Sequence, residues 1–161
     1  MAVLLVMGPA AVQAGEWSGQ AGGEYRGFFE TPLFPEQHDS YLSAFAQPEY
    51  RHVWDNDKQR IAFVAFGRVS QYDEARTHAD IRELNWQKSG DGYEWRVGIH
   101  KIFWGVTESQ HLVDIINQTD LVENPDGEDK LGQPMINLTL VREWGTLDFF
   151  VLTGFRERTF P

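Results

Sequence analysis

Alternation of apolar and polar residues is the dominant pattern in this chain, and it is clearest in residues 93–105. Tyr93, Trp95 and Val97 belong to an apolar set, and the residues between them are mostly polar. A period of two places successive side chains on opposite faces of an extended strand. The segment therefore predicts a β-strand with one apolar and one polar face. Lys101–Ile102 interrupts the alternation, as a β-bulge would.

Strand-like segments recur along the chain, and apart from one short piece the pattern predicts no helix. The expected strands cover residues 16–30, 40–54, 59–72, 78–87, 93–105, 135–143 and 146–155. Tight turns rich in Gly, Asp and Asn separate several of them. The sequence therefore predicts an all-β fold with antiparallel up-and-down strands.

The connections between these strands alternate in length. The turns after the second, fourth and sixth strands are short, whereas the connections after the first, third and fifth are longer. Outer-membrane barrels show this rule, with short periplasmic turns and long outer loops. Most of the expected strands also have about 10 or more residues, near the length that crosses a bilayer at a tilt. We therefore expect a partial transmembrane β-barrel of about seven strands with an open edge.

A soluble antiparallel sheet, either a lipocalin-like barrel or a sandwich, is the alternative interpretation. The two interpretations differ in where the aromatic side chains point, because a lipocalin-like barrel places them inward and a membrane barrel places them outward near strand ends. Five tryptophans lie near the ends of expected strands, namely Trp54, Trp86, Trp95, Trp104 and Trp144. This placement is typical of an aromatic girdle and favours the membrane barrel.

Composition narrows the classes of function. The chain has 161 residues, 14% of them aromatic, and a net charge of -10, with no cysteine. The charge argues against nucleic acid as a partner because no basic stripe offsets it. The absence of cysteine excludes disulfides and thiolate metal sites. No apolar run reaches the ~18 residues that a transmembrane helix needs.

The N-terminus predicts export. Residues 1–14 are mainly apolar or small, and Val12-Gln13-Ala14 has small residues at the two positions that a signal peptidase reads. A buried first element of a soluble domain is the alternative for this stretch. We expect residues 1–14 to be a signal peptide, and residues 15–161 to form the N-terminal part of an outer-membrane β-barrel.

Two neighbouring motifs resemble a known family. Residues 97–105 read Val-Gly-Ile-His-Lys-Ile-Phe-Trp-Gly, and residues 114–120 read Asp-Ile-Ile-Asn-Gln-Thr-Asp. This order resembles the N-terminal portion of porin-like outer-membrane β-barrels of Gram-negative bacteria, in which a strand ending in Trp-Gly precedes a loop that reads Asp-Val-Ile-Asn-Pro-x-Asp. Gln118 stands at the position of that proline. The resemblance covers residues 77–142 and implies passive passage of solutes across the bacterial outer membrane.

The long connection of residues 106–134 is strongly acidic. Its seven acids and one base give a net charge of −6. Near a pore mouth such a loop sets a negative field that favours cations or polar neutral solutes. Bases on the polar sides of the strands face it. The candidate pore-lining residues are Arg68, Arg82, Arg96, His100, Asp114 and Asp120. The alternative to this role at the pore mouth is a solvated loop, with bases that pair locally.

The sequence offers no catalytic, cofactor-binding or metal-binding set. We find no His-x-x-x-His pair, nucleophile elbow, phosphate-binding loop or dinucleotide fingerprint. Asp126, Glu128 and Asp129 could hold calcium, but EF-hand spacing is absent. We therefore expect a porin-like barrel, not an enzyme and without a cofactor, that contacts outer-membrane lipid and passes small solutes. The alternative function is a secreted, soluble β-sheet protein that binds a ligand.

Overall fold

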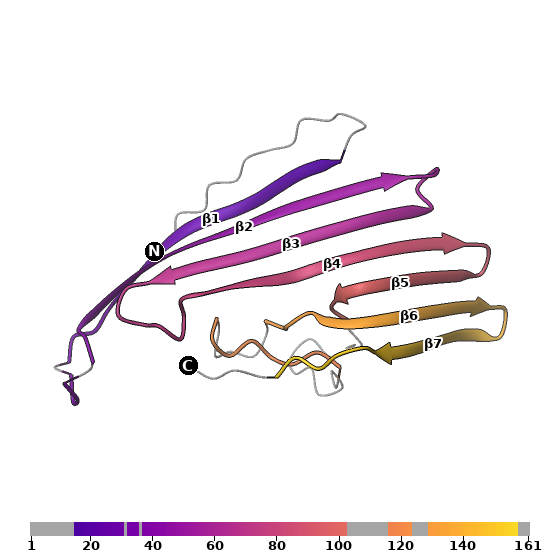
Figure 1. Ribbon diagram of the computed structural model, residues 1–161. Helices are drawn as coiled ribbons and strands as arrows, with labels where there is room; N and C mark the ends of the chain where they lie inside the picture. The colour runs from indigo at the N-terminus through magenta and orange to yellow at the C-terminus, as the bar shows by residue number, and fades with distance from the viewer. Residues whose placement is uncertain (1–14, 31, 36, 103–115, 124–128, 158–161) are drawn as a thin grey trace.

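A computed structural model describes residues 15–30, 32–35, 37–102, 116–123 and 129–157 of the chain. These residues form one antiparallel sheet of seven strands, whose order in space is their order in the chain (Figure 1). The strands are β1 (Glu16–Gly27), β2 (Ser40–Trp54), β3 (Gln59–Ser70), β4 (His78–Gly90), β5 (Tyr93–His100), β6 (Gln133–Arg142) and β7 (Gly145–Leu152). The predicted all-β, up-and-down fold is confirmed.

All three short turns lie at one end of the sheet, and all three long connections lie at the other (Figure 1). The short turns are residues 55–58, 91–92 and 143–144. This follows from the pairing of each strand with its neighbour in the chain, since every second connection then returns to the same end. Strand ends were less predictable, and β1, β3 and β7 stop earlier than the alternation suggests.

The expected β-bulge at Lys101–Ile102 is wrong, because β5 already ends at His100. The register shift lies between β3 and β4 instead. Val64 pairs with Glu83 and Ala65 pairs with Ile81, so Arg82 is the extra residue of β4. A bulge turns an additional side chain toward one face of a sheet. Here it places Arg82 beside Glu83 on the same face.

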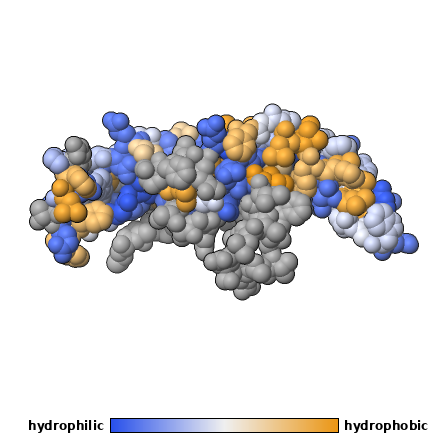
Figure 2. Space-filling model, turned by 90° about the horizontal axis from the view of Figure 1, so that it is seen from below, coloured by the Kyte–Doolittle hydropathy of each residue, from blue (hydrophilic) through white to orange (hydrophobic). Residues whose placement is uncertain are grey.

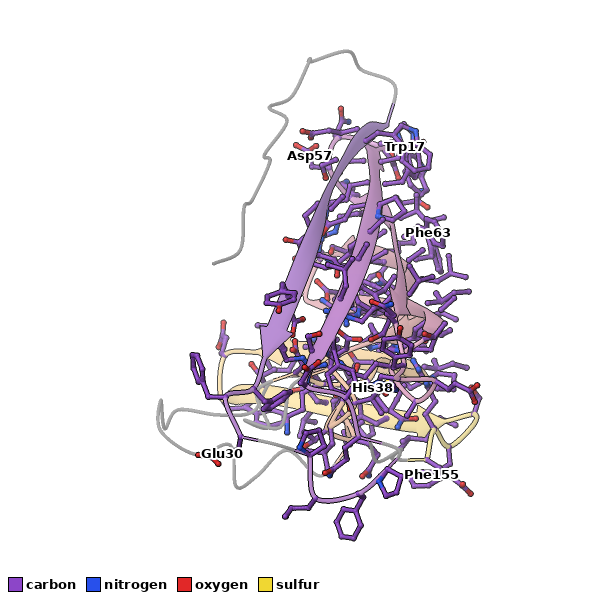
Figure 3. All side chains as sticks on the ribbon, turned by 90° about the vertical axis from the view of Figure 1, so that its left-hand side faces the viewer. Trp17, Glu30, His38, Asp57, Phe63 and Phe155 are labelled. Atoms are coloured by element: carbon purple, nitrogen blue, oxygen red, sulfur yellow. The ribbon has the colours of Figure 1, made fainter. Side chains whose placement is uncertain are left out.

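One face of the sheet, which we name the apolar face, is exposed and carries most of the exposed hydrophobic residues of the strands. Its members from neighbouring strands pair directly, as Phe63 does with Leu84 and Trp86 with Val97. Trp17 and Phe63 project from this side of the sheet in Figure 3. Side chains here are exposed despite being hydrophobic, among them Trp17, Tyr25, Leu42, Ile81, Leu84, Trp95, Val97, Leu147, Phe149 and Val151. Exposure of so large an apolar area marks a surface that meets lipid or protein.

Tryptophans on the described strands gather at the end of the sheet with short turns. Trp17 lies at the start of β1, Trp54 ends β2, and Trp86 and Trp95 lie close to the turn between β4 and β5. Trp144 is itself in the last turn and is 72% exposed. Figure 2 shows hydrophobic residues concentrated toward this end and again at the far tip of the molecule. Trp104 lies outside the described residues.

The opposite face, which we name the polar face, is where most burial occurs. The residues with the least exposed surface include charged and amide side chains, and Gln133, Asn85 and Asn137 are 0%, 4% and 6% exposed. The same face also buries the hydrophobic residues Ala62, Val64, Phe66 and Met135. The buried face of this sheet therefore mixes polar and hydrophobic side chains, whereas the apolar face stays exposed.

Gly98 is the strand position least able to accept a side chain. Its φ is +127°, and a Cβ atom there would lie 2.1 Å from the backbone oxygen of Leu84. We predict that Gly98→Ala lowers the free energy of unfolding by about 2 kcal/mol or more, because both the backbone conformation and the contact become strained. Denaturant titration of the folded protein measures this change.

Gly67→Ala is the matched control. Gly67 lies in β3, and a Cβ atom there would meet nothing within 4 Å. We expect it to change the unfolding free energy by less than about 0.5 kcal/mol. Equal effects of the two substitutions would contradict the strain at Gly98.

Candidate functional site

The connection between β5 and β6 returns to the polar face of the sheet. Asn117 holds its base, since its Oδ1 accepts the N–H of Ile102 at 2.8 Å and its Nδ2 donates to the carbonyl oxygens of His100 and Leu131 at 3.2 and 2.9 Å. Asn117 is 2% exposed. The described part of the acidic connection is therefore seated against the sheet.

A buried ion pair joins this connection to β3. Nε of Arg68 donates to both carboxylate oxygens of Glu123 at 3.1 and 3.0 Å, and its Nη2 donates at 2.8 Å. The two side chains are 8% and 4% exposed. A guanidinium that donates two N–H groups of one edge to a carboxylate makes some of the strongest charged hydrogen bonds in proteins.

Two further charged residues, Glu24 and Arg76, contact this pair. Glu24 of β1 accepts from Nη1 of Arg68 at 3.0 Å and pairs with Arg76 at 3.4 Å. Arg76 also donates to the backbone oxygen of Glu123 at 3.4 Å. Glu24 also lies 2.9 Å from Arg26, so its carboxylate meets three guanidinium groups, whereas the carboxylate of Glu123 meets that of Arg68. These pairs offset part of the cost of taking the charges out of water.

Arg82, which the bulge turns toward the polar face, makes a second contact between the sheet and the connection. Arg82 lies 3.8 Å from Asp120 and donates to Oε1 of Gln47 at 3.0 Å. Its guanidinium also lies 3.8 Å from the ring centre of Phe66, a cation–π distance. Asp120 accepts the backbone N–H of Glu123 at 3.3 Å. We name Glu24, Arg68, Arg76, Arg82, Asp120 and Glu123 together the charge cluster.

Other bases of the polar face lie outside the charge cluster. Arg96 of β5 pairs with Glu94 at 3.2 Å and donates to Gln87 at 3.4 Å. Lys101 follows β5 and lines a cavity of about 410 Å³ together with Arg82 and acidic side chains of β2 and β4. Burial lowers the pKa of Lys101, and the neighbouring Arg82 lowers it further. The polar face therefore carries charges of both signs along its length.

The structure brings together three of the predicted pore-lining residues, Arg68, Arg82 and Asp120. Arg96 lies on the same face but pairs within β4 and β5. His100 also lies on this face, where it is 1% exposed beneath the seated connection. Asp114 lies outside the described residues.

Sequence reasoning did not single out Glu24, Arg76 or Glu123. Glu123 was one of several acids in an acidic loop, and Arg76 was part of a polar connection. The sequence signal that could have identified the packed part of this loop was hydrophobicity rather than charge, because Val122 and Leu131 are hydrophobic residues inside it. Both are buried, with 7% and 8% exposure. Hydrophobic positions within an acidic loop therefore marked the segment that packs against the sheet.

Among the described residues, no group of three His, Asp or Glu side chains is placed to hold a metal ion. Asp126 and Glu128 lie outside these residues, so the calcium hypothesis at that turn stays a prediction. In the same described part of the chain, no helix has the length and apolar character to cross a membrane. No protein-family model, curated protein or solved structure matches this chain.

Replacing Glu123 by Gln tests the anchor of the connection. The substitution removes one charge and leaves Arg68 buried with only Glu24 to balance it. We predict that Glu123→Gln lowers the free energy of unfolding by about 3 kcal/mol, because breaking a buried pair leaves an uncompensated charge. Denaturant titration provides the measurement.

Glu143→Gln is the matched control, since Glu143 is an exposed acid in the turn between β6 and β7. We expect it to change the unfolding free energy by less than about 0.5 kcal/mol. If both substitutions have the same small effect, the Arg68–Glu123 pair does not hold the connection in place.

Proposed function

We propose that this chain forms part of the wall of a porin-like β-barrel in the outer membrane of a Gram-negative bacterium, through which small solutes pass. The observation that carries the proposal is the contrast between the two faces of the sheet, an exposed apolar face and a polar face that buries paired charges. In a membrane barrel the apolar face meets lipid and the polar face lines the lumen.

Charge placement on the apolar face supports contact with a bilayer. Along the described strands, its charged residues are Lys88 and Arg142, and both lie next to short turns. Long basic side chains at such positions reach the interface while their stems stay in apolar surroundings. The central part of this face is aliphatic, aromatic or glycine, as a lipid-facing band requires.

The two ends of the sheet support an orientation. Outer-membrane barrels have short periplasmic turns and long outer loops. The end with the turns at 55–58, 91–92 and 143–144 then faces the periplasm, and its tryptophans lie at the inner interface. The charge cluster lies in the other half of the sheet, toward the proposed cell exterior.

In this proposal the described part of the connection between β5 and β6, residues 116–123 and 129–132, narrows the lumen. The Arg68–Glu123 and Arg82–Asp120 contacts hold its described part against the inner wall. Solutes then pass a surface of fixed, paired charges, which favours small polar molecules over apolar ones. The resemblance of residues 77–142 to porin-like barrels supports the same function.

A secreted, soluble β-sheet protein is the competing function. Such a domain covers its hydrophobic residues with a second layer or turns them into a barrel interior. Within the described residues, no second layer covers the apolar face, and Trp17 and Phe149 are 65% and 52% exposed. This observation favours the membrane barrel.

Two successive residues of β1 distinguish these functions. Ala21 lies on the apolar face and Gln20 on the polar face, at adjacent positions of one strand. We predict that Ala21→Lys reduces the free energy of folding into lipid vesicles by about 2–4 kcal/mol, the cost of a cation at the lipid-facing centre of a barrel. Tryptophan fluorescence during denaturant titration in vesicles reports the change.

Gln20→Lys is the control, and we expect an effect below about 1 kcal/mol because its ammonium group faces the aqueous lumen. A soluble sheet predicts small effects for both substitutions, since both positions are exposed. Similar small values for the pair would reject the membrane barrel.

Ion selectivity tests the role of the loop. Asp120→Asn removes the acid beside Arg82 and leaves that base with one fewer negative neighbour. We predict that the variant is less cation-selective than the parent protein, because the local field at the constriction becomes more positive. Reversal potentials across planar bilayers in a salt gradient measure this property.

Asp57→Asn serves as the comparison, because Asp57 lies in the exposed turn between β2 and β3 at the opposite end of the sheet. We expect its reversal potential to equal that of the parent protein. If the parent protein conducts and Asp120→Asn leaves the reversal potential unchanged, the loop has no part in ion selectivity.

A further inference from the structure

A cavity of about 570 Å³ lies beside the charge cluster, at the end of the sheet with long connections. Its wall includes Arg26, Phe28, His38, Tyr41, Tyr72 and Asp73. We name it the vestibule cavity. Figure 3 shows His38 and Glu30 at this end, opposite the turn that contains Asp57. The volume falls within the range of small-molecule sites.

Aromatic rings form a connected frame around this cavity. His38 stacks on Tyr72 with ring centres 3.9 Å apart. Tyr41 meets His38 and Phe28 edge to face, each at 6.1 Å. These pairs bring rings together at angles near 90°, so the frame presents apolar surfaces in more than one direction. Such surfaces suit a ligand with apolar faces of its own.

Tyr72 is held in an unfavourable conformation without being buried. Its φ is +61°, in the left-handed region that residues other than glycine, asparagine and aspartate rarely occupy. Its side chain is nonetheless 59% exposed. Burial of the ring therefore does not account for the strain, and strain of this kind clusters at sites that bind ligands.

The guanidinium group in the cavity wall is already paired, and the wall also carries the acids Glu30 and Asp73. Arg26 lies 2.9 Å from Glu24 and 3.9 Å from Asp73. An anionic ligand would find no uncompensated cation on Arg26. The guanidinium also lies 6.0 Å from the ring centre of Tyr41, where an organic cation would meet repulsion. Hydrogen-bond donors and acceptors remain available on these side chains for a neutral ligand.

We propose that the vestibule cavity binds a neutral saccharide, with its C–H faces on the aromatic frame and its hydroxyl groups on Arg26 and Asp73. A saccharide needs both kinds of contact, because each sugar ring carries apolar faces and a hydroxyl edge. Hydroxyl groups donate and accept, which matches a guanidinium and a carboxylate on the same wall.

The cavity is linked directly to the charge cluster. Glu24 pairs with Arg26 of the cavity at 2.9 Å and with Arg68 of the cluster at 3.0 Å. On the outer-membrane orientation proposed above, a solute from the cell exterior meets the vestibule cavity before the seated loop. Only this order of encounter rests on the proposed function, whereas saccharide binding requires no pore.

The experiment is calorimetric titration of the detergent-solubilised protein with maltotriose, cellotriose and triacetylchitotriose, tested one at a time. We expect at least one to bind with a Kd of about 1 mM or tighter. Tyr72→Asn should weaken that binding about tenfold, the loss expected for one aromatic contact. Asparagine tolerates the left-handed backbone, so this variant removes the ring while keeping the turn.

Tyr25→Asn is the matched control, because Tyr25 is another exposed tyrosine of the same region but lies on the apolar face. It should bind the saccharide as the parent protein does. Absence of binding by all three saccharides, or equal binding by the Tyr72→Asn variant, overturns the proposal. Preferential binding of citrate, an anionic probe, overturns it as well.

Conductance measured on the same preparation separates the two proposals. Ion conduction without saccharide binding rejects the vestibule site and leaves the porin function standing. Saccharide binding without ion conduction supports the vestibule site and rejects the porin function.

Discussion

The ion pair between Arg68 and Glu123 is the contact on which the arrangement of the polar face depends. It joins β3 to the connection after β5 and is shielded from solvent on both sides. Burial of two charges is costly unless further hydrogen bonds satisfy them. Glu24 and Ser43 accept the remaining donor of Arg68, each at 3.0 Å. The pair therefore draws on β1 and β2 as well, and the loop, held through its own Asn117, lies over His100.

This contact also explains why the sheet is polar on the side that it buries. Charged and amide groups there find partners in the seated loop and in neighbouring strands, so they remain hydrogen-bonded when water is removed. Most of the exposed hydrophobic residues of the strands occupy the other side, where the described residues leave them uncovered. A water-exposed sheet would gain from the opposite placement, because hydrophobic burial is the main favourable term in folding. This exposed apolar face is the observation on which the membrane proposal rests.

Much of the fold could be predicted from the sequence, because period-two alternation is a local signal. It located all seven strands and the end at which the short turns lie. The charge cluster was less accessible. Arg68, Arg82 and Asp120 could be selected by their place in the pattern, but the residue that binds Arg68 depends on how a long loop returns to the sheet. Alternation carries no information on that path.

The β-bulge is a second feature that the alternation pattern alone did not locate. A break in parity is visible at Lys101–Ile102, yet it marks the end of β5 rather than an inserted residue. The real bulge at Arg82 lies in a stretch whose polar residues hide the shift. Its position is set by pairing with β3, where Val64 and Ala65 face Glu83 and Ile81. Only a partner strand reveals which residue is extra.

The strand order has a kinetic meaning. Every strand pairs with its sequence neighbour, so the sheet can grow one hairpin at a time from local contacts, the arrangement that favours fast folding. The contacts between Arg68 and Glu123 and between Asp80 and Arg156 span 55 and 76 residues. Closing loops of that length costs more chain entropy than closing a two-residue turn. The seven-stranded sheet can therefore be complete while the described part of the connection after β5 is still unseated, and the contact between Arg68 and Glu123 forms late.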